Sequence, residues 1–256
     1  MPSSATFISS CAFAHRAPDD PIVYPREPGY SHDHTFVGNV STNAFSTLRS
    51  LRRARSTCYR YGDTAAYWAP TLYVDGEPVT PRTATLYYRR LTTAPVRAFP
   101  SGLRMVAGDS RAWRPQSPAV THWDCAVLKE NFYGTRSTQS ASRSAASSVI
   151  PHCSPYSELQ LIVNFPDCWN GKSIDSANHK SHMAYSVAGR CPAGHPVAVP
   201  ALSLVYSYPP GVGRIVVLSS GTQYSGHADF INSWNEPALT KLVDDCLNHG
   251  RGCGGD

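Results

Sequence analysis

Four short segments of the sequence concentrate side chains that can bind a metal ion or transfer a proton. They span residues 15–34, 165–185, 191–197 and 224–234. Seven of the ten histidines lie in them, and each also contains Gly, Pro or Asn. This composition is typical of loops that carry functional side chains on a rigid scaffold.

The tripeptide His32-Asp33-His34 suggests a metal site. Side chains alternate in an extended segment, so both rings project to one side and Asp33 points the opposite way. His182 and His227 could join this pair around Zn²⁺ or Cu²⁺. Because no established signature such as H-E-x-x-H is present, a divalent metal is an alternative here and no cofactor is assigned.

Acid/base cleavage of a glycan is the favoured interpretation of the same segments. Glycoside cleavage requires two carboxyl groups on either side of one bond, and we expect Asp229 and Asp167 to act as acid and base. Four histidines would orient the substrate or share the proton transfers: His32, His34, His182 and His227. The alternative is that these groups cap loops and satisfy buried backbone atoms.

Two tryptophans and one further histidine are predicted to contact the glycan. Trp169 and Trp234 lie near the candidate carboxylates in sequence, and flat aromatic rings can stack on sugar rings. His195, in the segment CPAGHPV, is expected to line the same cleft.

Other chemistries lack their sequence signatures. The chain has no G-x-S-x-G elbow and no phosphate-binding G-x-x-x-x-G-K-[ST] motif. The net charge of +5 is partly local to residues 48–56, which are interpreted as a solvated basic face. No DNA- or RNA-binding pattern accompanies this face, so nucleic acid is not expected as a partner.

The eight cysteines are widely spaced and form no C-x-x-C pair, which predicts disulfides rather than a zinc or redox motif. Disulfides persist in oxidising compartments, so we expect a secreted protein whose export signal is missing or truncated in this sequence. No apolar run is long enough for a membrane span. The disulfide pairing and the oligomeric state stay open.

The fold is predicted to be mainly β, a single-domain β-sandwich-like core with long loops and one C-terminal helix. Strands are expected at residues 70–74, 84–91, 158–165, 201–208 and 213–221, with a hairpin turn at Asp75-Gly76. Asn235 is a candidate N-cap for the helix, and Gly250 is its candidate end. Cys246 falls on the apolar stripe of this helix, in a position to link it to the sheet.

The predicted domain runs from residue 11 to residue 250. A serine-rich segment at about 135–149 is interpreted as a mobile surface loop. Residues 1–10 and 251–256 are expected to be flexible ends.

Several motifs, in one order, resemble those of the secreted domain-of-unknown-function family DUF1996, which occurs in fungi and actinobacteria. The motifs include APDDPIVYP, SHDHTFVGN, FPDCWNGKSIDSANHKSHMAY, CPAGHPV and HADFINSW. The family pattern usually has Asp where this chain has Asn170 and Asn178, so any chemistry of those two carboxylates would be missing here. The resemblance implies secretion, one domain and a setting among polysaccharides, because fungal relatives are often fused to carbohydrate-binding modules.

By this resemblance, a functional cleft would be formed by seven motif residues: His32, His34, Asp167, His182, His195, His227 and Asp229. The sequence therefore leaves three hypotheses. The first is a hydrolase or lyase acting on cell-wall or plant polysaccharide. The second is a metal-binding secreted protein, and the third is a non-catalytic module that binds cell-wall glycan.

Overall fold

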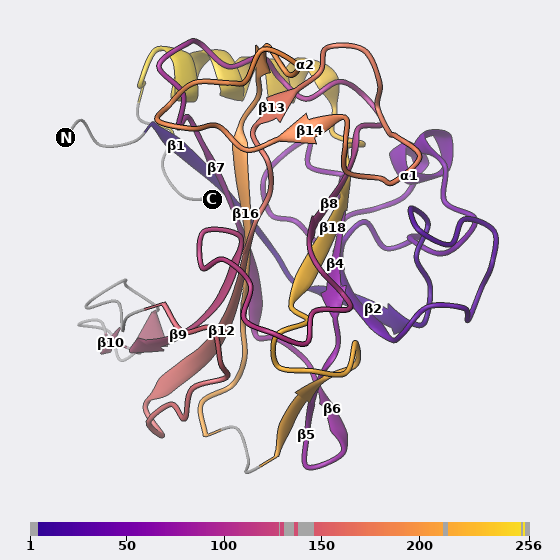
Figure 1. Cartoon of the computed structure of the whole chain (residues 1–256), viewed down its shortest axis with the longest axis vertical. Coiled ribbons are helices and arrows are strands. Elements are labelled where there is room, and N and C mark those ends of the chain that lie inside the picture. The colour runs from indigo at the N-terminus through magenta and orange to yellow at the C-terminus, as the bar shows by residue number, and fades with distance from the viewer. Residues whose placement is uncertain are drawn as a thin grey trace.

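The core of the protein is two five-stranded antiparallel sheets packed face to face, seen in a computed structural model (Figure 1). The structure describes residues 5–127, 129–130, 136–137, 146–211, 215–251 and 253. The first sheet has the order β1 (Thr6–Cys11), β7 (Thr83–Arg89), β16 (Ala201–Ser207), β12 (Ser157–Asn164) and β9 (Thr121–Val127). The second has the order β2 (Phe13–Ala17), β3 (His34–Gly38), β4 (Ala66–Pro70), β18 (His227–Ile231) and β8 (Arg104–Gly108). The predicted β-sandwich-like fold is confirmed.

The interior between the sheets is built by alternating side chains of both sheets. Leu202, Leu204 and Tyr206 project from β16 into the same apolar cluster as Ala228 and Phe230 of β18. This is the period-two pattern of a strand with one face toward the core. One continuous cluster therefore joins the two sheets.

Trp234 belongs to this interior, and its predicted role in binding a glycan is wrong. Its side chain is 1% exposed. The indole Nε1 donates a hydrogen bond to the Tyr88 hydroxyl at 3.0 Å, and the Tyr67 hydroxyl lies 3.2 Å from it. Buried tryptophan normally finds such a partner for its N–H group, so Trp234 is a core residue.

The outer face of the second sheet is also buried. Phe36 of β3, Trp68 of β4 and Ile231 of β18 form a second apolar cluster there. Ile22, from the segment before β3, and Leu51, from helix α1 (Leu48–Arg53), pack on this cluster and cover it. Both faces of β3, β4 and β18 are therefore shielded from water, which explains why every residue of these strands is buried.

A three-stranded sheet that contains a hairpin extends the sandwich at one end (Figure 1). Strand β5 (Leu72–Val74) turns into β6 (Glu77–Val79), and β17 (Val216–Leu218) pairs with β5. The turn residues Asp75 and Gly76 have φ values of 51° and 90°. Two positive φ angles define the type I′ turn that this dipeptide favours, so the predicted hairpin is confirmed.

The remaining strands are short. They are β10 (Lys129–Glu130), β11 (Arg136–Ser137), β13 (Cys168–Trp169), β14 (Met183–Ala184) and β15 (Val197–Ala198). Strand β13 lies between β14 and β15 in a small sheet that carries the long segment rich in His and Asp. The predicted serine-rich loop at 135–149 falls mostly outside the described residues.

The C-terminal helix α2 (Glu236–Leu242) begins as predicted, because the Asn235 side chain accepts a hydrogen bond from the backbone N–H of Ala238. It continues as a π-helical segment, η1 (Val243–Asn248). Cys246 is buried there, but its disulfide partner is Cys253, seven residues further on. Because Cys253 forms a β-bridge with Phe7 of β1, this disulfide links the helix to the edge of the first sheet, as predicted.

The first and the last described segments of the chain meet at the edge of the first sheet. Cys253 forms a parallel β-bridge with Phe7 of β1, and β1 pairs with β7 along its whole length. The prediction of flexible ends is thus wrong for residues 6–10 and for Cys253.

All eight cysteines are paired, as predicted. The disulfides are Cys11–Cys58, Cys125–Cys153, Cys168–Cys191 and Cys246–Cys253. Such a set fits an oxidising compartment. Within the described part of the chain, no helix is long and apolar enough to cross a membrane.

We predict that Trp234→Ala lowers the free energy of unfolding by about 3–5 kcal/mol, because it leaves a large cavity in the core. Trp169→Ala is the matched control, since Trp169 is only partly buried on a small outer sheet. Guanidinium denaturation with intact disulfides measures both variants. Equal losses of stability for the two would contradict the assignment of Trp234 to the core.

Candidate metal centre

Three histidines meet on the covered outer face of the second sheet. The Nε2 atom of His227 lies 3.2 Å from Nε2 of His32 and 3.4 Å from Nε2 of His34. His34 is 0% and His227 3% exposed, whereas His32 is partly exposed. Two of the three rings are thus buried, and that of His32 is in contact with solvent.

The order and register of the strands produce this meeting. His34 begins β3 and pairs with Pro70 of β4, and Asp229 of β18 pairs with Trp68 of the same strand. Because side chains alternate along a strand, His227 and Asp229 share the outer face with His34. His32 lies just before β3, and its ring packs 4.3 Å from that of His34, centroid to centroid.

Backbone carbonyl groups fix the proton on two of the rings. Nδ1 of His34 donates a hydrogen bond to the carbonyl oxygen of Asp19 at 3.0 Å, and Nδ1 of His227 donates to that of Ser225 at 2.8 Å. A carbonyl can only accept, so in a neutral ring Nδ1 carries the proton and Nε2 presents a lone pair. Metal-binding histidines characteristically have such a partner.

Burial keeps the three rings neutral. It lowers the pKa of His227 to about 3 and that of His32 to about 4, and it holds the pKa of His34 well below its ordinary value. In each case the main cause is loss of hydration, which disfavours the charged form. Neutral imidazole is the form that binds metal ions.

Two buried carboxyl groups adjoin the histidines. One carboxylate oxygen each of Asp20 and Asp229 and one ring nitrogen of His34 lie within 4.8 Å of one another. Asp20 accepts hydrogen bonds from the backbone N–H groups of Ile22 and Val23. Neither carboxylate oxygen of Asp229 has a hydrogen-bond partner among the described residues. Burial raises the pKa of both aspartates, that of Asp229 strongly.

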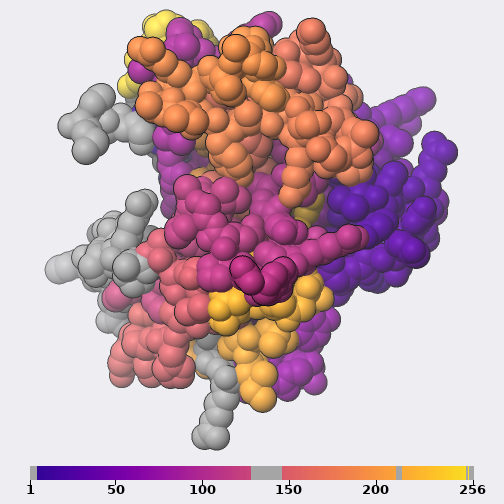
Figure 2. All heavy atoms as spheres, viewed as in Figure 1, coloured from indigo at the N-terminus to yellow at the C-terminus, as the bar shows by residue number. Residues whose placement is uncertain are grey.

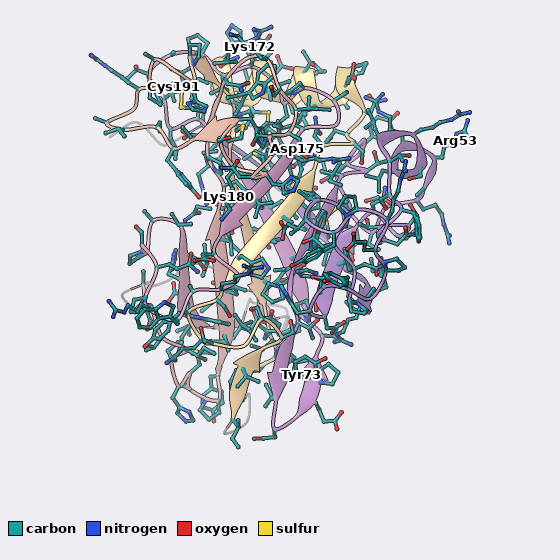
Figure 3. All side chains as sticks on the ribbon, turned by 45° about the vertical axis from the view of Figure 1, so that its right-hand side comes forward. Arg53, Tyr73, Lys172, Asp175, Lys180 and Cys191 are labelled. Atoms are coloured by element: carbon teal, nitrogen blue, oxygen red, sulfur yellow. A yellow bond between two sulfur atoms is a disulfide. The ribbon has the colours of Figure 1, made fainter. Side chains whose placement is uncertain are left out.

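Lys180 lies beside β8, the neighbour of the strand that carries His227 (Figure 3). Its ammonium group donates a hydrogen bond to the carbonyl oxygen of Gly108 at 2.5 Å, and Gly108 pairs with His227 across the sheet. Lys180 is close enough to lower the pKa of both His227 and Asp229. On the face shown in Figure 2, the N-terminal loops in indigo, the magenta segment after β8 and the orange segment before β14 come together.

His182 does not join the three histidines. Its Nε2 lies 2.7 Å from the carbonyl oxygen of Arg104, and its Nδ1 lies 3.0 Å from the Ser176 hydroxyl. Both ring nitrogens are thus engaged with other groups. Nearby, Asp175 contacts Arg104 at 3.3 Å and His179 at 3.0 Å. This second polar group fixes the segment between β13 and β14 against β8.

The other predicted site residues have local structural partners. The Asp167 carboxylate is 3% exposed and accepts hydrogen bonds from the backbone N–H and the hydroxyl of Ser186. Trp169 donates from Nε1 to the carbonyl oxygen of Ser173, and a ring nitrogen of His195 contacts that of Ser181. No hydrogen bond or ion pair among the described residues joins Asp167 to Asp229 or to the three histidines, and the acid/base role of the two aspartates stays a prediction.

Asp20 and Lys180 are the site residues to which the sequence interpretation gave no role. Both occur in the quoted motifs, Asp20 in APDDPIVYP and Lys180 in the long segment before β14. Asp20 is 162 residues from His182 and 207 from His227 by sequence number, so only the strand order could reveal which of these two histidines lies near it. Its signal was the Asp19-Asp20 pair in a segment that also contains His15 and His34.

These observations define a disulfide-bonded, mainly β protein with a three-histidine centre on one sheet. A family model described as "Domain of unknown function (DUF1996)" matches residues 20–234, and the chain belongs to this family. The match includes all residues of the centre and ends before α2. No curated protein and no solved structure matches the chain significantly.

The neutral histidines make a prediction about pH. The folded pKa of His227 is about 3, against 6.5 for the exposed group, so between these values the unfolded chain binds the additional proton. Stability of the metal-free protein therefore rises with pH through this window, with a slope of up to about 1.4 kcal/mol per pH unit for one histidine. We expect the His227→Gln variant to lose this contribution.

The measurement is urea denaturation of parent and variant between about pH 4 and pH 6.5 in the presence of a chelator. The raised pKa of Asp229 has the opposite effect, but Asp229 is present in both proteins. The parent should lose stability more steeply than the variant as the pH falls. Parallel profiles would show that His227 is protonated in the folded protein.

Proposed function

We propose that the protein is a secreted metalloenzyme in which His32, His34 and His227 bind a divalent transition-metal ion. The observation that carries this proposal is the convergence of three Nε2 atoms on one point. The four disulfides support secretion, because such bonds persist in oxidising surroundings.

The electrostatics of the cluster favour a cation at its centre. Nδ1 of His34 and Nδ1 of His227 both donate to carbonyl groups, so their Nε2 lone pairs face each other at 3.4 Å. Two lone pairs at this distance repel unless a positive species lies between them. Burial opposes protonation of both rings, which leaves a metal ion as the species that suits the site.

The donor set indicates the class of metal and leaves room for chemistry. Imidazole nitrogen suits Zn²⁺, Cu²⁺ and related ions. Three protein ligands leave a coordination position for water or substrate, as in catalytic rather than structural zinc sites. His32 is partly exposed, so this open position is accessible from solvent.

A space for substrate lies beside the centre. A pocket of about 260 Å³ is lined by residues that include Val106, Gly108, Lys180 and Tyr185. Val106 and Gly108 pair with Asp229 and His227 across the sheet, so the pocket adjoins the metal position. Its size suits a single sugar-sized group rather than a large ligand.

The proposed reaction is cleavage of an extracellular polysaccharide by hydrolysis or elimination. A divalent ion in such a site acidifies a bound water and polarises a substrate oxygen. Lys180 would face an anionic or developing negative group of the substrate at the mouth of the pocket. Polysaccharide is proposed as the substrate because the chain resembles secreted fungal relatives. The activity experiment below tests this choice of substrate.

Metal binding is tested by elemental analysis after dialysis against Zn²⁺. We expect the parent to retain at least about one equivalent of zinc per chain. The His227→Gln variant should retain at least about one equivalent less, because one of the three ligands is removed. His195→Gln is the control, since His195 contacts a carbonyl outside the cluster. Zinc that is absent from the parent, or retained in His227→Gln, would refute the centre.

Catalysis is tested on a panel of cell-wall and plant polysaccharides with zinc-loaded and copper-loaded protein. Oligosaccharides should be released, the release should stop when a chelator removes the metal, and His227→Gln should lose at least about 100-fold in rate. Metal binding without release from any polysaccharide would reject the enzyme while leaving a metal-binding secreted protein.

A further inference from the structure

We propose that the centre has a second cation position, formed by Asp20 and Asp229 beside His34, for a hard divalent ion such as Mn²⁺ or Mg²⁺. This inference rests on the proposed histidine-bound metal and makes the centre binuclear. The second position has its own carboxylate ligands, which no step of the proposed function uses.

The geometry brings two candidate ligand groups together through one residue. Ligand atoms of Asp20, His34 and Asp229 lie within 4.8 Å of one another, and so do those of His32, His34 and His227. His34 is common to both groups, but its Nδ1 donates to the Asp19 carbonyl group and its Nε2 lone pair serves the first position, so the ligands of the second position are the two aspartates. The two positions are therefore neighbours, with the nitrogen-rich position on the His32 side and the oxygen-rich position on the Asp229 side.

The burial of Asp229 and its lack of hydrogen-bond partners among the described residues point to a bound ion. Its side chain is 0% exposed, and neither of its oxygens has a hydrogen-bond partner among the described residues. A buried polar group without a partner carries a large desolvation cost. An ion bound between Asp229 and Asp20 would supply the missing interaction.

The local charge distribution favours the same conclusion. Asp20 is 4% exposed, and one of its oxygens is engaged by the backbone N–H groups of residues 22 and 23. Lys180 is the nearby cation, but its described hydrogen bond is to the Gly108 carbonyl group. Two carboxyl groups this close cannot both be charged unless a positive species lies between them, and a divalent ion would neutralise both.

The chemistry of the ligands separates the two positions. Carboxylate oxygens suit Mg²⁺ and Mn²⁺, and Mg²⁺ is commonly held by one or two carboxylates together with water and substrate oxygens. Imidazole nitrogens suit zinc and copper. Paired ions about 3.5–4 Å apart can stabilise both the attacking and the leaving oxygen of a cleaved bond, so the substrate would be bound between them.

The experiment titrates Mn²⁺ into chelator-treated protein that has first been loaded with one equivalent of Zn²⁺. Free Mn²⁺ is followed by electron paramagnetic resonance, and zinc by elemental analysis. The parent should bind one Mn²⁺ per chain. Asp229→Asn and Asp20→Asn should each bind Mn²⁺ at least about 100-fold more weakly, since even the partners of metal ligands contribute 10- to 100-fold. Both variants should keep their zinc.

Asp33→Asn is the matched control, because it removes one negative charge beside His32 while its oxygen stays in reach of the Tyr73 hydroxyl. It should bind Mn²⁺ as the parent does. Circular dichroism and thermal unfolding verify that each variant is folded. If Asp229→Asn fails to fold, Asp20→Asn decides, since asparagine keeps an oxygen for the two backbone N–H groups.

Three results would overturn the second position: no Mn²⁺ bound by the parent, Mn²⁺ binding unchanged in folded Asp20→Asn or Asp229→Asn, or loss of zinc together with Mn²⁺ in those variants. The last result would make Asp229 a ligand of a single centre. Failure of the proposed function has a different signature, because the parent would then hold no zinc at the histidines.

Discussion

The pairing of β4 with β3 on one side and with β18 on the other is the constraint on which the centre depends. Neighbouring strands lie about 4.8 Å apart, so the backbones that carry His34 and His227 are separated by roughly two such spacings. Pro70 pairs with His34, and the register of Asp229 with Trp68 brings His227 level with it. Both imidazoles can then lean over Pro70 until their Nε2 atoms approach to 3.4 Å.

The cover of the outer face sets the chemical state of these rings. Ile22 and Leu51 close the apolar cluster beside the histidines, and Asp19 connects this cover to the centre. The Asp19 carboxylate accepts hydrogen bonds from the backbone N–H groups of Gly29 and Ala44, while its carbonyl oxygen accepts from His34. Excluding water lowers the pKa of the rings, and the carbonyl group selects the tautomer. The segment before β3 thus contributes both to the apolar packing, through Ile22, and to the tautomer of His34, through Asp19.

Local patterns in the sequence predicted what depends on neighbours along the chain. The strands β5, β7, β12, β16 and β17, the Asp75-Gly76 turn and the same-face pair His32 and His34 follow from period two and turn chemistry. The strands of the second sheet were not predicted, apart from Pro70 at the end of β4. Convergence could not be predicted in the same way, because it depends on sheet order. Trp234 was misassigned because its proximity to Asp229 in sequence does not show to which face of the sheet its side chain projects. Trp234 lies in the core between the sheets, whereas Asp229 lies on the outer face of the second sheet. Asp167 accepts two hydrogen bonds from Ser186 as a loop-capping carboxylate does, and such a carboxylate has the same sequence appearance as a catalytic one.

The buried polar groups of the centre destabilise the metal-free fold, and interactions elsewhere in the molecule have to offset this loss of stability. The facing lone pairs of His34 and His227 are buried in one region with the Asp229 carboxyl group, which has no hydrogen-bond partner among the described residues. Sites that break local packing rules in this way are typically functional and are held in place by their surroundings. Here the surroundings are a core continuous across both sheets and four disulfides. Since an ion that binds only the folded state stabilises it, occupancy of the proposed metal site and stability of the fold would be thermodynamically coupled.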